Sequence, residues 1–121
     1  MNRKTLVFGA SLHGYRYSNL ALRRLAEKGI EAIGFGLVPG KVAGAEILTD
    51  LTSVGDIDTI SLYMNPGLQR EFYDDILRIR PRRVIFNPGT ENPELYDLLR
   101  KEGIMVEVGC TLVMLATGQY A

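Results

Sequence analysis

The chain has 121 residues, of which 46% are hydrophobic and 23% are charged, a composition typical of a soluble globular domain. Its 14 basic and 14 acidic side chains cancel, which argues against a nucleic-acid-binding protein, since such proteins usually carry a basic excess. With one cysteine and no apolar run near the roughly 20 residues of a membrane span, we expect a single cytoplasmic domain over residues 1–121, without a disulfide or a membrane segment.

Five short apolar runs predict buried β-strands, because strands that are covered on both faces read as continuous apolar segments. They lie at residues 6–8, 30–35, 57–63, 84–86 and 105–108. Segments with helical spacing separate most of these runs, which indicates βαβ units and a parallel sheet. We therefore predict a Rossmann-like α/β fold: a doubly wound, five-stranded parallel sheet in the order 3-2-1-4-5, with helices on both faces.

Capping residues predict where the helices begin. Ser18 is the expected N-cap of the first helix, Pro66 suits the first position of a later one, and Asn92 is the expected N-cap of the clearest one. The segment 37–56 is the least regular, and we expect one short helix in it, near Leu51.

The segment after the first run, residues 9–17, is the first candidate ligand loop. A buried strand that leads into a small-residue turn and a helix is how nucleotide-binding α/β domains begin. Gly9 lets a phosphate approach the backbone, the Ser11 hydroxyl can donate to it, and the Arg16 guanidinium can bind it through two hydrogen bonds. The alternative interpretation is a plain surface loop with a solvated arginine.

The segment after the second run carries no acidic side chain, although an NAD site usually has one there to bind the ribose 2′-hydroxyl. Pro39-Gly40-Lys41 follows instead and places a cation beside the expected crevice. A lysine at this place favours a ligand with an additional phosphate, while the alternative is a lysine that simply faces solvent.

Two Asn-Pro-Gly turns, at residues 65–67 and 87–89, follow the third and fourth runs. Ordinary turn formation explains each of them, but two at one edge of a sheet favour a ligand site. Cys110 opens the last expected helix, where a thiol is a candidate nucleophile if a base lies nearby. The only histidine, His13, lies in a different loop, so a catalytic Cys–His pair is not favoured.

Four arginines precede the fourth run and are expected to form a solvated surface at the opposite edge of the sheet: Arg78, Arg80, Arg82 and Arg83. No set of His, Cys, Asp or Glu residues has the spacing of metal ligands.

Taken together, these motifs resemble the CoA-binding domain of small stand-alone bacterial proteins, which is also the N-terminal domain of the succinyl-CoA synthetase α subunit. The likeness covers about residues 4–116. Gly9-Ala10-Ser11 is similar to the family's first phosphate loop, Pro39-Gly40-Lys41 to its CoA-contacting Pro-Gly-Lys segment, and Asn87-Pro88-Gly89 to its Gln-x-Gly segment. Residues 63–66 stand at the place of its adenine-side loop. The chain departs from the family in having no tryptophan and in having Gly109 before Cys110, where the family has arginine.

The resemblance implies a domain that binds coenzyme A or an acyl-CoA and has no catalytic activity of its own, because the synthetases keep their phosphohistidine in a separate domain. It implies that Ser11 holds the diphosphate, that Arg16 and Lys41 neutralise phosphates, and that Cys110 borders the pantetheine path. The expected ligand-binding residues are Gly9, Ser11, Arg16, Pro39, Lys41, Tyr63, Asn65, Pro66, Asn87, Pro88, Gly89 and Cys110.

Other functions stay open on the residues alone. An NAD(P)-binding sensor or regulatory domain is the main alternative, and the lysine after the second run leaves NADP possible. A small enzyme that uses Cys110 and an interaction module without a ligand are two more. We expect a small-molecule nucleotide as the partner, with neither nucleic acid nor membrane, and the sequence identifies no protein partner.

Overall fold

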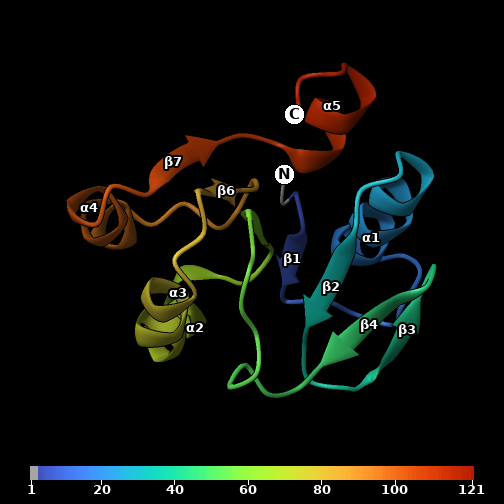
Figure 1. The fold of residues 1–121 in the computed structure, drawn as a ribbon, viewed down its shortest axis with the longest axis horizontal. Helices are drawn as coiled ribbons and strands as arrows, with labels where there is room; N and C mark the ends of the chain where they lie inside the picture. The colour runs from blue at the N-terminus through green and yellow to red at the C-terminus, as the bar shows by residue number, and fades with distance from the viewer. Residues whose placement is uncertain (1–2) are drawn as a thin grey trace.

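The computed structural model describes residues 3–121 (Figure 1). Within these residues, seven strands form one sheet in the order β3-β4-β2-β1-β5-β6-β7. All neighbouring strands are parallel except β3 and β4, which form an antiparallel hairpin. The strands are β1 (Thr5–Phe8), β2 (Ala32–Phe35), β3 (Gly40–Val42), β4 (Ala45–Leu48), β5 (Thr59–Leu62), β6 (Arg83–Phe86) and β7 (Met105–Val108).

The predicted α/β class and mostly parallel sheet are confirmed, but the five-strand order 3-2-1-4-5 is wrong. The segment that was expected to hold a short helix near Leu51 forms the β3–β4 hairpin instead, and β4 takes the place beside β2. The run at 57–63, predicted to lie beside β2, is β5 and pairs with the other side of β1. Ala43 and Gly44 both have positive φ, 50° and 84°, as a tight hairpin turn requires.

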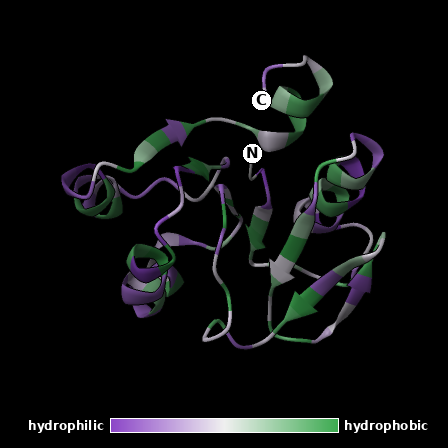
Figure 2. Ribbon diagram, in the orientation of Figure 1, coloured by the Kyte–Doolittle hydropathy of each residue, from purple (hydrophilic) through white to green (hydrophobic). Residues whose placement is uncertain are grey.

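Helices cover both faces of the sheet. They are α1 (Tyr17–Glu27), α2 (Pro66–Gln69), α3 (Tyr73–Ile79), α4 (Pro93–Lys101) and α5 (Thr111–Ala116), with a 3-10 turn at Arg70–Phe72. Because side chains alternate along a strand, Leu6 and Phe8 of β1 face α3 and α4, while Val7 faces α1 and α5. Hydrophobic stripes on α1, α3 and α4 run beside hydrophilic ones in Figure 2.

The helix starts were predicted with mixed success. Asn92 caps α4 as expected, because its side chain accepts a hydrogen bond from Leu95 N–H, and Pro66 is the first residue of α2 as expected. Asn65 is the N-cap of α2, a role that the sequence analysis did not predict. The prediction for α1 is wrong, because that helix begins at Tyr17 and Ser18 is buried in its first turn. Each helix in residues 3–121 is too short or too polar to span a lipid bilayer.

Candidate ligand-binding site

The carboxyl ends of the central strands stop at one level. Phe8, at the end of β1, is in register with Phe35 of β2 and with Leu62 of β5, and Leu62 is in register with Phe86 of β6. The segments that follow these four strands therefore share one edge of the sheet, which we call the carboxyl edge. Most of the residues predicted to bind a ligand lie on it.

The turn after β1 is held against β2 by main-chain contacts. The carbonyl oxygen of Phe35 accepts hydrogen bonds from the N–H groups of Gly9 and Ala10, both at 2.8 Å. Gly9 has φ +97°, and a Cβ added there would lie 3.1 Å from the backbone of Tyr63. At Gly36 a Cβ would lie 2.1 Å from the carbonyl oxygen of Ala10. Glycine is required on both sides, so backbone itself forms this wall of the edge.

Side chains of α1 hold the loop that continues from this turn. The carbonyl of Ser11 accepts a hydrogen bond from Asn19 at 2.9 Å, and Arg23 donates to the carbonyl of Gly14 at 3.0 Å. The Ser11 hydroxyl oxygen accepts from the His13 N–H at 3.1 Å, which leaves the hydroxyl proton available to another acceptor. Arg16 is exposed at the N-cap of α1.

The first turn of α1 suits an anion. It contains no acidic residue, and the Arg16 side chain makes no capping hydrogen bond. The amide groups at the start of an 11-residue helix therefore meet no protein carboxylate within that turn.

The β3–β4 hairpin lies beside this loop. A Cβ at Gly40 would be 2.7 Å from the Leu12 side chain, so the two segments touch. Lys41 is exposed and lies on the other face of the hairpin, because neighbouring strand residues point in opposite directions. It lines a pocket of about 460 Å³ with Pro39, Glu46 and Asp50 among others. The structure therefore brings the backbone of residues 39–41 to the loop, while the Lys41 side chain opens into this pocket.

The segment after β5 contains an unpartnered buried hydroxyl. The Tyr63 N–H donates to the carbonyl of Phe8 at 2.8 Å, which ties the segment to β1. Within the described residues, the Tyr63 hydroxyl has no hydrogen-bond partner of acceptable geometry, although Ser61 and Thr111 lie close to it. Burial raises the pKa of Tyr63 to about 12. Asn65 and Pro66 form the start of α2, where the Asn65 side chain accepts from Leu68 N–H at 3.1 Å.

Asn87 is a structural residue of the edge. Its amide donates to the Ser61 hydroxyl at 3.0 Å and to the Leu62 carbonyl at 2.7 Å, and its side-chain oxygen accepts from Thr111 N–H at 2.8 Å. These contacts use both amide protons inside the protein. The next two residues, Pro88 and Gly89, are exposed in the turn.

Cys110 is half-buried at the N-cap of α5, beside this network. Ser61 and Thr111, whose buried hydroxyls lie 2.7 Å apart, were missed by the sequence analysis. Polar residues within or beside an apolar run were the available signal. Among the described residues, no three His, Cys, Asp or Glu side chains gather as they would around a metal ion.

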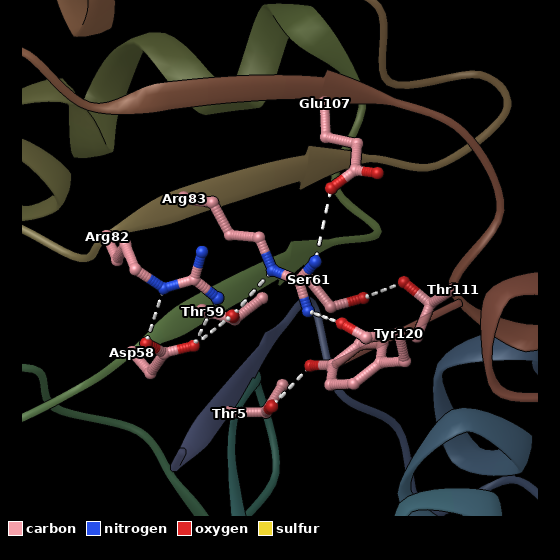
Figure 3. A network of polar contacts seen from close by, with 9 residues as sticks. All are labelled: Thr5, Asp58, Thr59, Ser61, Arg82, Arg83, Glu107, Thr111 and Tyr120. Atoms are coloured by element: carbon pink, nitrogen blue, oxygen red, sulfur yellow. Dashed lines mark hydrogen bonds and ion pairs between the residues drawn. The ribbon is translucent and has the colours of Figure 1, made fainter. Parts of the chain in front are cut away.

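The prediction that the arginines at the opposite edge form a solvated surface is wrong for Arg83. Arg83 is only 5% exposed and donates to Thr59 at 2.9 Å and to Glu107 at 3.2 Å (Figure 3). Arg82 forms a two-bond pair with Asp58, and the pKa of that carboxyl is lowered, chiefly by the Arg82 hydrogen bond. The prediction missed Arg83 because its partners come from distant parts of the chain.

Comparison with known proteins adds to this geometry. A family model described as a CoA binding domain matches residues 3–116. A crystal structure of an uncharacterized protein is 44% identical, with a TM-score of 0.93 and 98% of each chain covered. A conserved hypothetical protein from Pyrococcus furiosus is 25% identical, with a TM-score of 0.80, 92% of this chain and 97% of that one covered. A Thermus thermophilus protein shares the fold at 20% identity, with a TM-score of 0.85, 98% of this chain and 90% of that one covered. No curated protein matches the chain.

Proposed function

This chain belongs to the CoA-binding domain family, and on that premise we propose that it binds coenzyme A or an acyl-CoA at the carboxyl edge and catalyses no reaction of its own. The observation that carries the proposal is the main-chain wall at Gly9 and Gly36, followed directly by a braced loop and the start of α1. The N–H groups of Gly9 and Ala10 are bonded to Phe35, so the peptide N–H groups proposed to meet a diphosphate are those at the start of α1, which follows the braced loop.

The diphosphate is proposed to lie over residues 9–17. The Ser11 hydroxyl donates one hydrogen bond to it, and the exposed Arg16 supplies a cation at the start of α1. Asn19 and Arg23 keep the loop in place through its carbonyl groups, so little ordering is needed when the ligand binds.

Lys41 is proposed to bind the phosphate on the ribose of coenzyme A. It is exposed and lines a pocket of about 460 Å³ together with Pro39, and residues 9–17 do not line this pocket. Tyr63 and Pro66 border the adenine side of the path, and the exposed Pro88-Gly89 turn and half-buried Cys110 border the pantetheine side. Asn65 and Asn87 support these segments through protein contacts, as an N-cap and as a tie between strands.

Isothermal titration with coenzyme A, dephospho-CoA, acetyl-CoA and NADP tests the proposal. Lys41→Glu is expected to lower the affinity for coenzyme A by about tenfold, which is about 1.4 kcal/mol of binding free energy. The affinity for dephospho-CoA should stay nearly unchanged. Lys28→Glu is the matched control, because Lys28 is exposed at the other end of α1. Acetyl-CoA should be recovered intact after incubation with the protein.

Three results would contradict the proposal or a part of it. Absence of coenzyme A binding to the unmodified protein would reject the ligand, and tighter binding of NADP would favour the sensor alternative. Equal coenzyme A affinity for Lys41→Glu and Lys28→Glu would reject the role of Lys41.

A further inference from the structure

One segment crosses a face of the sheet from edge to edge. It runs from Cys110 to Tyr120 and includes α5; we call it the strap. It starts after β7 at the carboxyl edge and ends over the beginnings of β1 and β6, at the amino edge. Figure 1 shows α5 beside α1 on this face.

The sheet surface beneath the strap mixes polar and apolar side chains. Thr59 and Ser61 of β5 are fully buried there, whereas Ile60 and Leu62 of the same strand belong to the apolar core on the other face. Arg83 of β6 joins the polar part, and Val7 and Ile85 form the apolar part. Opening the strap therefore exposes less apolar surface than opening a wholly apolar interface would.

The strap is fastened by hydrogen bonds at the carboxyl edge. Thr111 N–H donates to Asn87 at 2.8 Å, and the Thr111 hydroxyl lies 2.7 Å from that of Ser61. Asn87 in turn donates to the carbonyl of Leu62 at 2.7 Å. The start of α5 is thereby joined to the turn after β6, which belongs to the proposed ligand site.

A second fastening holds the strap at the amino edge (Figure 3). The carbonyl of Tyr120 accepts a hydrogen bond from Arg83, and its hydroxyl is hydrogen-bonded to Thr5. The Arg83 guanidinium also lies 4.5 Å from the centre of the Tyr120 ring, a cation–π contact. Tyr120 is only 6% exposed and lies beside a pocket of about 250 Å³ that Arg3 and Asp58 help to line.

Between the fastenings, Met114 and Leu115 pack in an apolar cluster with Leu22 of α1 and with Val7 and Ile85 of the sheet. The helix has six residues, and so short a helix is not stable by itself. Its order therefore depends on this packing and on the fastenings at its two ends.

We propose that the strap opens and closes as one unit, and that Tyr120 is a positioning residue for the ligand site at the far edge. When Tyr120 moves away from Arg83, α5 loses one of its two fastenings, and the contacts of Thr111 with Asn87 loosen. The second half of this inference, the effect on ligand, rests on the proposed binding of coenzyme A.

Amide hydrogen exchange and coenzyme A titration test the two halves separately, on Tyr120→Ala, Tyr120→Phe and the control Ile79→Val, all well below their melting temperatures. Ile79 is buried against the other face of the sheet. In Tyr120→Ala the amides of α5 should exchange at least about tenfold faster, with α4 unchanged. The Kd for coenzyme A should rise at least about threefold. Tyr120→Phe keeps the ring on Arg83, so its α5 exchange rate and its Kd for coenzyme A should stay close to those of the unmodified protein.

The outcomes separate the two proposals. If α5 exchanges no faster than α4 in Tyr120→Ala, the strap is not a separate unit and the inference is overturned. If α5 exchange rises but the Kd does not, Tyr120 positions nothing at the ligand edge. If the unmodified protein fails to bind coenzyme A, the proposed function and the positioning role fail together, and the exchange result alone still decides whether the strap is a unit. The control Ile79→Val should show faster amide exchange in all elements and an unchanged Kd for coenzyme A, which is the result expected of a variant that only lowers the stability.

Discussion

Gly36→Ala should damage the protein at a single backbone contact. The added Cβ would lie 2.1 Å from the carbonyl oxygen of Ala10, so the two atoms must separate by about 1 Å before the contact becomes tolerable. Neither atom can move by a side-chain rotation, because one is fixed to the backbone and the other is part of it. The turn after β1 has to shift instead.

The cost follows from what the shift disrupts. The Phe35 carbonyl holds Gly9 and Ala10 through two hydrogen bonds of 2.8 Å, each worth about 1 kcal/mol. Overpacking adds about 1–3 kcal/mol, and the lower entropy of alanine in the unfolded chain returns about 0.7 kcal/mol. We therefore expect the free energy of unfolding to fall by about 3 kcal/mol, with weaker coenzyme A binding, because the displaced turn leads into the ligand loop.

Urea denaturation followed by circular dichroism measures the change, with Gly55→Ala as the matched control. A Cβ at Gly55 meets no atom within 4 Å, and its φ lies outside the left-handed range, so this variant should be neutral or slightly more stable. If Gly36→Ala unfolds within about 0.5 kcal/mol of the unmodified protein, the argument that a main-chain wall shapes this edge is refuted.

Four further substitutions probe the polar groups. Tyr63→Phe removes a buried hydroxyl without a partner and should stabilise by about 1 kcal/mol in thermal melts. The folded pKa of Tyr63 is about 12 and the unfolded value is about 10, so between these pH values the hydroxyl ionises mainly in the unfolded chain. The protein should therefore lose stability as the pH rises from 10 toward 12, and Tyr63→Phe should abolish that loss. Asp58→Asn should lower the stability by about 1 kcal/mol at pH 7. Because Arg82 lowers the folded pKa of Asp58, the stability difference should disappear in thermal melts as the pH falls through that pKa. A difference that stays constant with pH would contradict this role of Asp58. Asn92→Ala should lower the free energy of unfolding in urea by about 2–3 kcal/mol, because Asn92 is buried and bonds Gln69 and Tyr73 besides capping α4. Asn65→Ala, at the exposed cap of α2, should lower it by only about 0.5–1 kcal/mol, and equal losses would refute this difference in burial.

Local patterns predicted much of this fold. Continuous apolar runs located β1, β2, β5, β6 and β7. This signal is strong for β1, β5 and β6 because they are buried along their whole length, whereas β7 at the edge of the sheet leaves Met105 and Val108 exposed. The β3–β4 hairpin was missed because its turn is Ala43-Gly44, and alanine at a positive φ has no turn signature. The predicted strand order is wrong for the same reason. Without β4, the place beside β2 was assigned to the next apolar run, residues 57–63, which is β5.

The candidate site was predicted less completely. Glycine, serine and proline patterns located the segments of the carboxyl edge, because strand ends in a parallel sheet meet there. What each side chain does depends on partners that are distant in sequence. Asn87 reads as a turn residue, but it ties three segments together. Arg83 reads as part of a solvated charge run, but Thr59, Glu107 and Tyr120 surround it only in the folded chain.

The wall at Gly9 and Gly36 also limits how ligand selectivity can be engineered. Peptide groups have the same shape and polarity whatever residue carries them, so substitutions in the wall disturb folding without offering a new recognition surface. The neighbouring loop is different, because Leu37 and Val38 are 98% and 58% exposed and lie outside the buried core. A variant library confined to those two positions can therefore change the surface beside residues 39–41 while the buried core is left alone.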